Sequence, residues 1–546
     1  MSTEGNHREI PLTASGLRPV LSQRFALTWE QAAVCSTFVA LFMYLNYIPL
    51  FHTEIWRHVG IGEWIIQNRK IPQFNPLLEL SVGMDYVCTS WLSQVLMAST
   101  VKFAGPEGLS NLLAILQVLT LSLLTISFYR VSKSKLLMMI GLLAVVSCWW
   151  GQLGILRPQV FGATCLSILL LMMNGFPAKT GRKGSPGIHI YSMAGIALLM
   201  VLWTNLDGSF LFGLLLVFAY SLDGFLAVRE NKTSLGQLWA SNQAWKWIYL
   251  FELSFFATWL NPQGPSVWLS VLDGSQNTLL ADAGGFRPLS LYSWHGLWLV
   301  AFGLTAIWAF RRSPLKIGVA PCLMLIAVLG LVSVNELLIA WMAPVGMIVL
   351  LPHLKHSIYG SEIGNARKTP KVVSEEPQPM AFVFSLASLL VVWIGFAFSP
   401  LSTPVLGGKP RPEKILHNRL TPISVAREFA QEPPTGVVWI PSYWADYLHW
   451  STSGRVRVFM NSDPQAIPSQ VRFDYLRVFR GDEGWKKILE RYDVQSLVID
   501  KKNQKALFQK LFADGKQWQI RFENRHLIIL DRKTHTLEGC NCGHEE

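Results

Sequence analysis

The sequence predicts a mainly α-helical, polytopic membrane protein followed by a soluble α/β domain. Of its 546 residues, 51% are hydrophobic and only 15% are charged, which is typical of a chain solvated mainly by lipid. Apolar runs of about 20 residues, the length of a spanning helix, recur along the first 400 positions. After about Glu413 the pattern changes to short strands alternating with helices, which favours a small α/β domain.

About eleven apolar runs are long enough to span a bilayer, and lipid requires them to be helical because it cannot satisfy open backbone groups. They comprise residues 31–51, 108–129, 136–153, 158–176, 190–206, 209–227, 244–260, 294–311, 316–333, 336–352 and 381–399. A further apolar run, Trp91 to Ala104, would cover only about 21 Å of a hydrocarbon core about 30 Å thick. We therefore predict that it does not cross.

The basic residues predict the topology, since short cytoplasmic loops carry the excess of Lys and Arg. Five basic clusters, each separated from the next by two predicted spans, lie at residues 130–135, 179–183, 229–232, 311–316 and 355–371. With Arg18 and Arg24 before the first span, they place the N-terminus in the cytoplasm and everything after Pro400 outside. The protein is expected to be a multi-pass protein of the cytoplasmic membrane whose first apolar run is retained as an anchor.

The net charge of +12 is explained largely by this bias. No basic stripe with interleaved aromatic residues argues for nucleic acid, so the bilayer is the expected partner and nucleic acid is not. Four cysteines lie in apolar runs and read as small buried hydrophobes. The Cys540-Asn-Cys542-Gly-His544 tail matches no standard zinc spacing, and structural tail and metal site both stay open.

The predicted organisation is a cytoplasmic tail, a membrane domain, a linker, an extracytoplasmic α/β domain and a polar tail. These segments comprise residues 1–30, 31–400 with an outer loop at 52–92, 401–412, 413–535 and 536–546. In the α/β domain, helices are expected at 423–431, 443–450, 469–479, 485–492 and 504–513, and strands at 437–440, 456–460, 496–499, 519–522 and 527–530. The alternation indicates a partly parallel sheet. It contains no Gly-rich phosphate loop, so nucleotide binding has little support.

Several motifs then occur in a particular order. The outer loop reads Glu-Ile-Trp-Arg-His at 54–58, Gly-Glu-Trp-Ile at 62–65 and Ile-Pro-Gln-Phe-Asn-Pro at 71–76. Further motifs follow at 91–95, 157–159, 203–208, 261–264, 443–448 and 458–463. Together they resemble bacterial GT-C-type membrane glycosyltransferases of the dolichyl-phosphate-mannose mannosyltransferase-like group. The resemblance spans most of the chain and implies a GT-C-like membrane domain.

The resemblance implies a hexosyltransferase that takes a sugar from a polyprenyl-phosphate carrier by direct displacement. The acceptor would be an extracytoplasmic glycan, lipid or protein. An acid in the first outer loop would act as base, because the attacking hydroxyl must lose its proton. Glu54 stands at the matching position. No cofactor is certain, and a divalent metal remains open.

The chain also departs from the group. The first acid of its usual pair is His52 here, Cys88-Thr89-Ser90 stands where acidic residues and His-Glu are frequent, and Asp207 replaces an expected histidine. Asp85 and Asp207 could compensate as catalytic acids. An inactive GT-C-like scaffold or glycan-binding subunit is the alternative, and a transporter is weaker because no buried acid lies mid-span.

Each candidate has a structural alternative. Glu54 could simply be a favourable charge at a helix N-terminus, and Asp207 could cap the next helix. The expected substrate-binding residues are Arg57, His58, Arg157, Asn205, Asn261 and Arg287. The basic ones could bind the carrier phosphate through charge-assisted hydrogen bonds, or contact lipid headgroups without catalysis.

Overall fold

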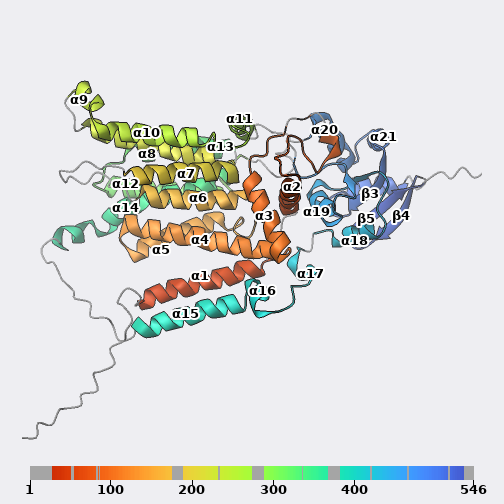
Figure 1. The fold of residues 1–546 in the computed structure, drawn as a ribbon, viewed down its shortest axis with the longest axis horizontal. Helices are drawn as coiled ribbons and strands as arrows, with labels where there is room; N and C mark the ends of the chain where they lie inside the picture. Colours follow the sequence, from red (N-terminus) through yellow and green to blue (C-terminus); the bar gives the residue numbers. More distant parts are fainter. Residues whose placement is uncertain are drawn as a thin grey trace, which may run out of the picture.

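A computed structural model describes residues 27–50, 54–81, 84, 86–174, 189–230, 234–273, 288–334, 336–366, 381–418, 421–463, 467–513 and 517–533. In this part of the chain, long helices run side by side in one body. A small sheet with flanking helices lies beyond one end of that body, and α2 (Glu54–Asn68) stands between the two (Figure 1). The fold therefore has the predicted order, with a helical part first and an α/β part second.

Every segment predicted to span the membrane forms a helix. The helices of this part are α1 (Trp29–Tyr47), α2, α3 (Trp91–Ala104), α4 (Gly108–Ser132), α5 (Lys135–Trp149), α6 (Pro158–Met173), α7 (Ile190–Leu206), α8 (Phe210–Glu230), α9 (Leu235–Trp239), α10 (Asn242–Ala257), α11 (Ser266–Asp273), α12 (Trp294–Arg312), α13 (Val319–Val334), α14 (Ile339–Ala366) and α15 (Ala381–Ala397). Helix α14 continues well past the predicted end at residue 352, since its internal prolines, Pro344 and Pro352, do not end it.

Within the described residues, two helices are long and apolar enough to cross a membrane, Gly108–Ser132 and Phe210–Arg229. Four further apolar helices are shorter, at Lys135–Trp149, Pro158–Met173, Ile190–Leu206 and Phe382–Ala397. The helical body also exposes large apolar side chains such as Leu143, Leu198 and Leu389. An apolar surface of this kind is typical of contact with lipid or with a partner. The number of helices that cross stays a prediction.

Helix α2 is held tightly against α3 by a glycine. A Cβ atom at Gly62 would lie 2.1 Å from the carbonyl oxygen of Gln94 in α3, so no larger residue fits at this crossing. Ile55, Val59 and Ile65 are buried on α2, while Gln67 and Asn68 are exposed. The close crossing and the one-sided apolar face fix how α2 lies across the end of the helical body.

The C-terminal domain is built around a mixed five-stranded sheet with the order β2-β1-β3-β5-β4. Its strands are β1 (Val437–Trp439), β2 (Arg457–Val458), β3 (Val494–Asp500), β4 (Trp518–Glu523) and β5 (Leu527–Arg532). Strand β1 pairs in parallel with β2 and β3, whereas β5 pairs antiparallel with β3 and β4. The predicted partly parallel sheet is confirmed. Strand β2 is shorter than predicted, because only Arg457 and Val458 pair with β1.

The helices of this domain are α18 (Ile423–Gln431), α19 (Ser442–Ser451), α20 (Ser469–Arg480), α21 (Trp485–Arg491) and α22 (Lys505–Ala513). They follow the predicted ranges to within two residues. Two short helices, α16 (Thr403–Leu406) and α17 (Glu413–Leu416), lie in and just after the predicted linker.

The two parts meet at α2 and at the end of the linker. The backbone N–H of Leu50 donates to the Leu416 carbonyl at 2.8 Å, and the N–H of Asn418 donates back to Leu50 at 3.2 Å. Trp56 of α2 is buried and stacks on Trp450 of α19, with ring centroids 3.9 Å apart. The first outer segment and the C-terminal domain thus form one packed interface.

Candidate active site

Glu54 is the first residue of α2 and forms an ion pair with Arg157. The distance from Glu54 Oε2 to Arg157 Nε is 3.1 Å, and both side chains are about one-third exposed, at 33% and 28%. Arg157 immediately precedes α6, which starts at Pro158 because proline fits the first helical turn. An accessible carboxylate therefore stands beside an accessible guanidinium where α2 and α6 both begin.

One turn along α2, Arg57 pairs with the C-terminal domain. Its Nη1 atom lies 3.0 Å from Oδ2 of Asp463, and both side chains are largely buried, with exposures of 14% and 11%. Burial alone would lower the pKa of Arg57, but the carboxylates of Asp463, Asp446 and Glu54 raise it above its usual range. Arg57 thus stays charged and links the acids on both sides of the interface.

Asp446 of α19 is the third acid of this cluster and the most buried. Its exposed fraction is 2%, and neither carboxylate oxygen has a hydrogen-bond partner of good geometry among the described residues. Burial raises the pKa of Asp446 to about 7, although Arg57 and Ser462 oppose this rise. The nearby charge of Glu54 contributes to it. A buried acid with so high a pKa exchanges its proton near neutral pH.

Asp207 lies elsewhere, at the turn between α7 and α8. Its carboxylate accepts the backbone N–H of Ser209 at 3.0 Å, and its exposed fraction is 3%. Asp207 packs closely against Gly162 of α6, where a Cβ atom would lie 2.7 Å from Asp207 Oδ2. Among the described residues, Asp207 forms no hydrogen bond or ion pair with Glu54. The bond to Ser209 is that of a residue that shapes the start of a helix, which was the structural alternative.

The two predicted asparagine ligands brace the same end of the body. Asn205 accepts the indole N–H of Trp91 at 2.7 Å and donates to the carbonyls of Val201 and Leu260. Asn261 donates to the Thr204 carbonyl at 3.0 Å and accepts the N–H of Gln263. These contacts use most of the hydrogen-bonding capacity of the Asn205 amide and half of that of the Asn261 amide. They tie α3, α7 and the loop after α10 together.

His58 lies on the inner side of α2. Its Nδ1 atom is 3.2 Å from Gln94 Nε2, and the ring is 8% exposed. Burial, and then the charges of Arg57 and Arg157, hold the pKa of His58 well below its usual range. The neutral ring could contact a phosphate only through a hydrogen bond, without supplying charge.

Three predicted positions fall outside the described residues. They are His52, Asp85 and Arg287, together with the Cys540 to His544 tail. Among the residues that the structure does describe, no three His, Cys, Asp or Glu side chains are grouped as metal ligands.

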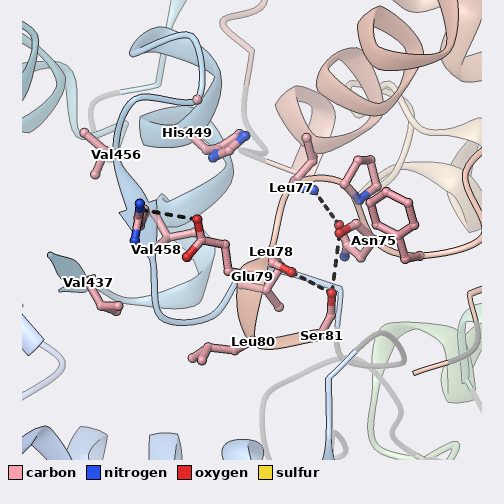
Figure 2. Close-up of a pocket in the computed structure, with 14 residues that line it drawn as sticks. Asn75, Leu77, Leu78, Glu79, Leu80, Ser81, Val437, His449, Val456 and Val458 are labelled. Atoms are coloured by element: carbon pink, nitrogen blue, oxygen red, sulfur yellow. Dashed lines mark hydrogen bonds and ion pairs between the residues drawn. The ribbon is translucent and has the colours of Figure 1, made fainter. Parts of the chain in front are cut away.

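Two cavities lie between the helical body and the C-terminal domain. One, of about 560 Å³, is lined by residues 74–81 and by Val437, His449 and Val456 to Val458. Figure 2 shows Asn75 at one side of this cavity, where its side chain accepts the Leu77 N–H, and His449 and Val458 across from it. The other, of about 1040 Å³, is also bordered by His449. Neither cavity is lined by Glu54, Arg157 or Asp207.

The fold is similar to that of a known oligosaccharyltransferase. The enzyme from Archaeoglobus fulgidus, tethered with an acceptor peptide containing the NVT sequon, matches with a TM-score of 0.51 and 12% identity, covering 93% of this chain and 74% of that one. The archaeal oligosaccharyltransferase AglB from the same organism, in complex with an inhibitory peptide and a dolichol-phosphate, matches with a TM-score of 0.50 and 12% identity over 94% and 76%.

ArnT from Cupriavidus metallidurans in the apo state also matches, with a TM-score of 0.47 and 11% identity, covering 91% of this chain and 97% of that one. No protein-family model and no curated protein sequence matches this chain. The likeness to the oligosaccharyltransferase structures shows that the chain has a GT-C fold.

Sequence reasoning placed Asp446 and Asp463 in motifs but gave them no role. The signal was their position: both lie in the segments 443–448 and 458–463 that follow the motif order of the GT-C-like membrane domain. Only the folded structure brings them to Arg57, some 400 positions earlier in the chain.

Proposed function

We propose that this protein transfers a sugar from a polyprenyl-phosphate carrier to an extracytoplasmic acceptor, with Glu54 as the base. The observation that carries the proposal is the accessible Glu54–Arg157 pair at the start of α2 and α6. The GT-C fold supports it, and so does the ordered set of motifs that resembles the dolichyl-phosphate-mannose mannosyltransferase-like group. The AglB complex with a dolichol-phosphate supports a lipid-phosphate donor.

The chemistry fits these two side chains. The acceptor oxygen forms a bond to the anomeric carbon as the bond from that carbon to the carrier phosphate oxygen breaks. The acceptor proton passes to the carboxylate of Glu54, the first residue of α2. The carrier leaves with its phosphate and the electron pair of the broken bond. A cation beside the departing phosphate stabilises the charge that develops there.

Arg157 is the cation that we assign to the carrier phosphate. Its side chain is 28% exposed, so it can reach an anion while remaining near Glu54. Arg57 is less suited to direct contact, because it is largely buried and already paired with Asp463. We assign Arg57 the role of holding α2 and the C-terminal domain together. Asp207, Asn205 and Asn261 shape the neighbouring turns.

The proposal includes the topology that the basic clusters predict. The Glu54 end of the helical body and the C-terminal domain would lie outside, and the N-terminus inside. Reporter fusions at Ser185 and after Leu537 test this arrangement. The first should report the cytoplasm and the second the outer side.

The test of the base is the variant Glu54→Gln in membranes supplied with a labelled polyprenyl-phosphate sugar. The amide keeps the size of the side chain but accepts no proton, so transfer should fall by about a thousandfold, within the usual range for a general base. Glu79→Gln is the matched control, since Glu79 is exposed and pairs only with Arg457 among the described residues. Unchanged transfer by Glu54→Gln would contradict the assigned role.

A second measurement separates the enzyme from a non-catalytic relative. One outcome is that the parent protein transfers no sugar from any labelled polyprenyl-phosphate donor and still binds glycans. In that case a glycan-binding subunit is the better proposal than a transferase.

A further inference from the structure

The larger cavity is a groove between the membrane domain and the C-terminal domain. It is lined by the second half of α2, the turn between α3 and α4, the linker after α15, and α19. Its volume of about 1040 Å³ is at the upper end of the range for small-molecule sites. Neither residue of the proposed catalytic pair, Glu54 or Arg157, lines it.

Aromatic side chains form part of its wall and are held in fixed positions. Trp450 stacks on Trp56 beneath the groove and donates its indole N–H to Glu63 Oε1 at 3.3 Å. Trp64 of α2 also lines the groove and contacts Phe74 edge to face, with ring centroids 5.9 Å apart. Rigid aromatic faces beside a carboxylate suit the alternating apolar faces and hydroxyl groups of sugar rings.

Buried polar atoms in the same wall lack hydrogen-bond partners. Arg411 pairs through Nε with Glu107 Oε1 at 2.5 Å and its guanidinium lies over the Tyr47 ring, but its Nη1 and Nη2 atoms are buried and have no hydrogen-bond partner in the described structure. Nδ1 of His417, a residue with 4% exposure, is likewise unpartnered there. Buried polar atoms without partners are costly, so their presence in a cavity wall points to a ligand that hydrogen-bonds.

The charge of the groove limits what that ligand can be. Its lining includes three carboxylates, those of Glu63, Glu107 and Glu413, and one guanidinium, that of Arg411. Glu107 is paired with Arg411 and Glu413 with Arg427, which leaves Glu63. Burial lowers the pKa of His417 and of His449, so neither ring adds positive charge near neutral pH. Glu63 pairs with no cation among the described residues. An anionic ligand would therefore meet no cation in this lining that is not already paired with a carboxylate, whereas hydroxyl or ammonium groups could bind the Glu63 carboxylate.

The groove and the proposed base lie on opposite sides of one helix. Glu54 and Glu63 are nine positions apart on α2, which is about two and a half turns and separates them by about 13.5 Å along the axis. Trp56 lies between them and supports the stacked Trp450. A ligand must therefore extend around α2 from the groove to reach Glu54, which requires more than one sugar ring.

We infer that this groove binds the acceptor as a neutral or amino-bearing saccharide of more than one ring. The inference rests on the proposed transferase function and names the substrate class that the same site takes. The carrier phosphate binds at the other end of α2, beside Arg157.

The test uses the full-length protein in detergent, labelled with a fluorophore and applied to an array of neutral, amino-bearing and acidic saccharides. The parent protein should bind members of the first two groups and none that is acidic only. Two variants probe the groove, Trp64→Ala and Glu63→Lys. Each should raise the dissociation constant of the bound saccharides about tenfold, as expected for one lost charge-assisted or stacking contact.

Glu79→Lys is the matched control, because it introduces the same charge change at the neighbouring cavity. It should bind like the parent protein. Thermal unfolding of each variant verifies that the fold is kept. The inference is overturned if the parent binds no saccharide, if it binds acidic saccharides alone, or if both groove variants bind as well as the parent.

Failure of the groove and failure of the proposed function give different results. If the groove is wrong, Trp64→Ala keeps the parent's KM for the acceptor while Glu54→Gln still loses transfer. If the base is wrong, Glu54→Gln transfers normally while Trp64→Ala raises the acceptor KM at unchanged kcat.

Discussion

Arg57 of α2 and Asp463 of the C-terminal domain form a largely buried ion pair, with Nη1 and Oδ2 3.0 Å apart. The pair joins two segments some 400 positions apart in the chain. It also places Arg57 where its charge acts on Asp446 and Glu54. The first outer helix and the C-terminal domain are therefore coupled by charge as well as by the Trp56–Trp450 stack.

Breaking this pair should loosen the interface. Asp463→Asn leaves the Arg57 charge buried without its partner, which we expect to lower the free energy of unfolding by about 3 kcal/mol. Thermal unfolding in detergent and protease cleavage between the two parts measure the loss. The double variant Arg57→Met/Asp463→Leu removes both charges and should recover most of it.

The control for this experiment is Glu413→Gln, which breaks an exposed pair with Arg427. Exposed pairs contribute about 0 to 1 kcal/mol, so the loss should be small. An equal loss in both variants would show that the buried Arg57–Asp463 pair stabilises the protein no more than an exposed pair does.

Asp446 predicts a pH-dependent stability. The pKa of Asp446 is about 7 in the folded protein and near 3.8 in the unfolded chain. The folded state therefore holds this proton more tightly. Its stabilising contribution is complete below about pH 4 and is lost as the pH rises through about 7.

The loss should be on the order of 3 to 4 kcal/mol between pH 4 and pH 8. Asp446→Asn removes the titrating group, so the difference in stability between parent and variant should shift in favour of the variant as the pH rises. Taking this difference cancels the opposite contributions of buried histidines. A difference that stays constant with pH would contradict the assignment.

Gly62 should tolerate no side chain. The Cβ atom of Gly62→Ala would meet the Gln94 carbonyl, which forces α2 and α3 apart and should cost about 1 to 3 kcal/mol. Gly303→Ala in α12 is the matched control, since no atom lies within 4 Å of its Cβ position. That substitution should raise the stability by up to about 1 kcal/mol through helix propensity. Thermal unfolding of the two variants in detergent compares them directly.

The sequence predicted helices and strands well because each leaves a local pattern. The apolar run at 190–206 coincides with α7, and the helix predicted at 423–431 coincides with α18. Asp446 left no such pattern, since its role depends on contact with Arg57, far away in the chain. Asp207 shows the opposite case. Its position at a helix start suggested a structural role, and the structure shows the bond to Ser209 that such a role requires. The local pattern could not reveal that Glu54 meets Arg157, because this contact is made between the starts of two helices.

Variants of Arg157 should separate donor binding from proton transfer. Arg157→Gln removes the accessible cation beside Glu54, so the KM for the polyprenyl-phosphate donor should rise about tenfold, the loss for one charge-assisted hydrogen bond. Arg157→Lys keeps the charge without the planar guanidinium and should retain part of the affinity. Glu54→Gln, in contrast, should lower kcat while leaving the donor KM near the parent value, because the carboxylate acts on the acceptor proton. Steady-state transfer with a labelled donor distinguishes the two patterns. An unchanged donor KM in Arg157→Gln would place the carrier phosphate away from the start of α6.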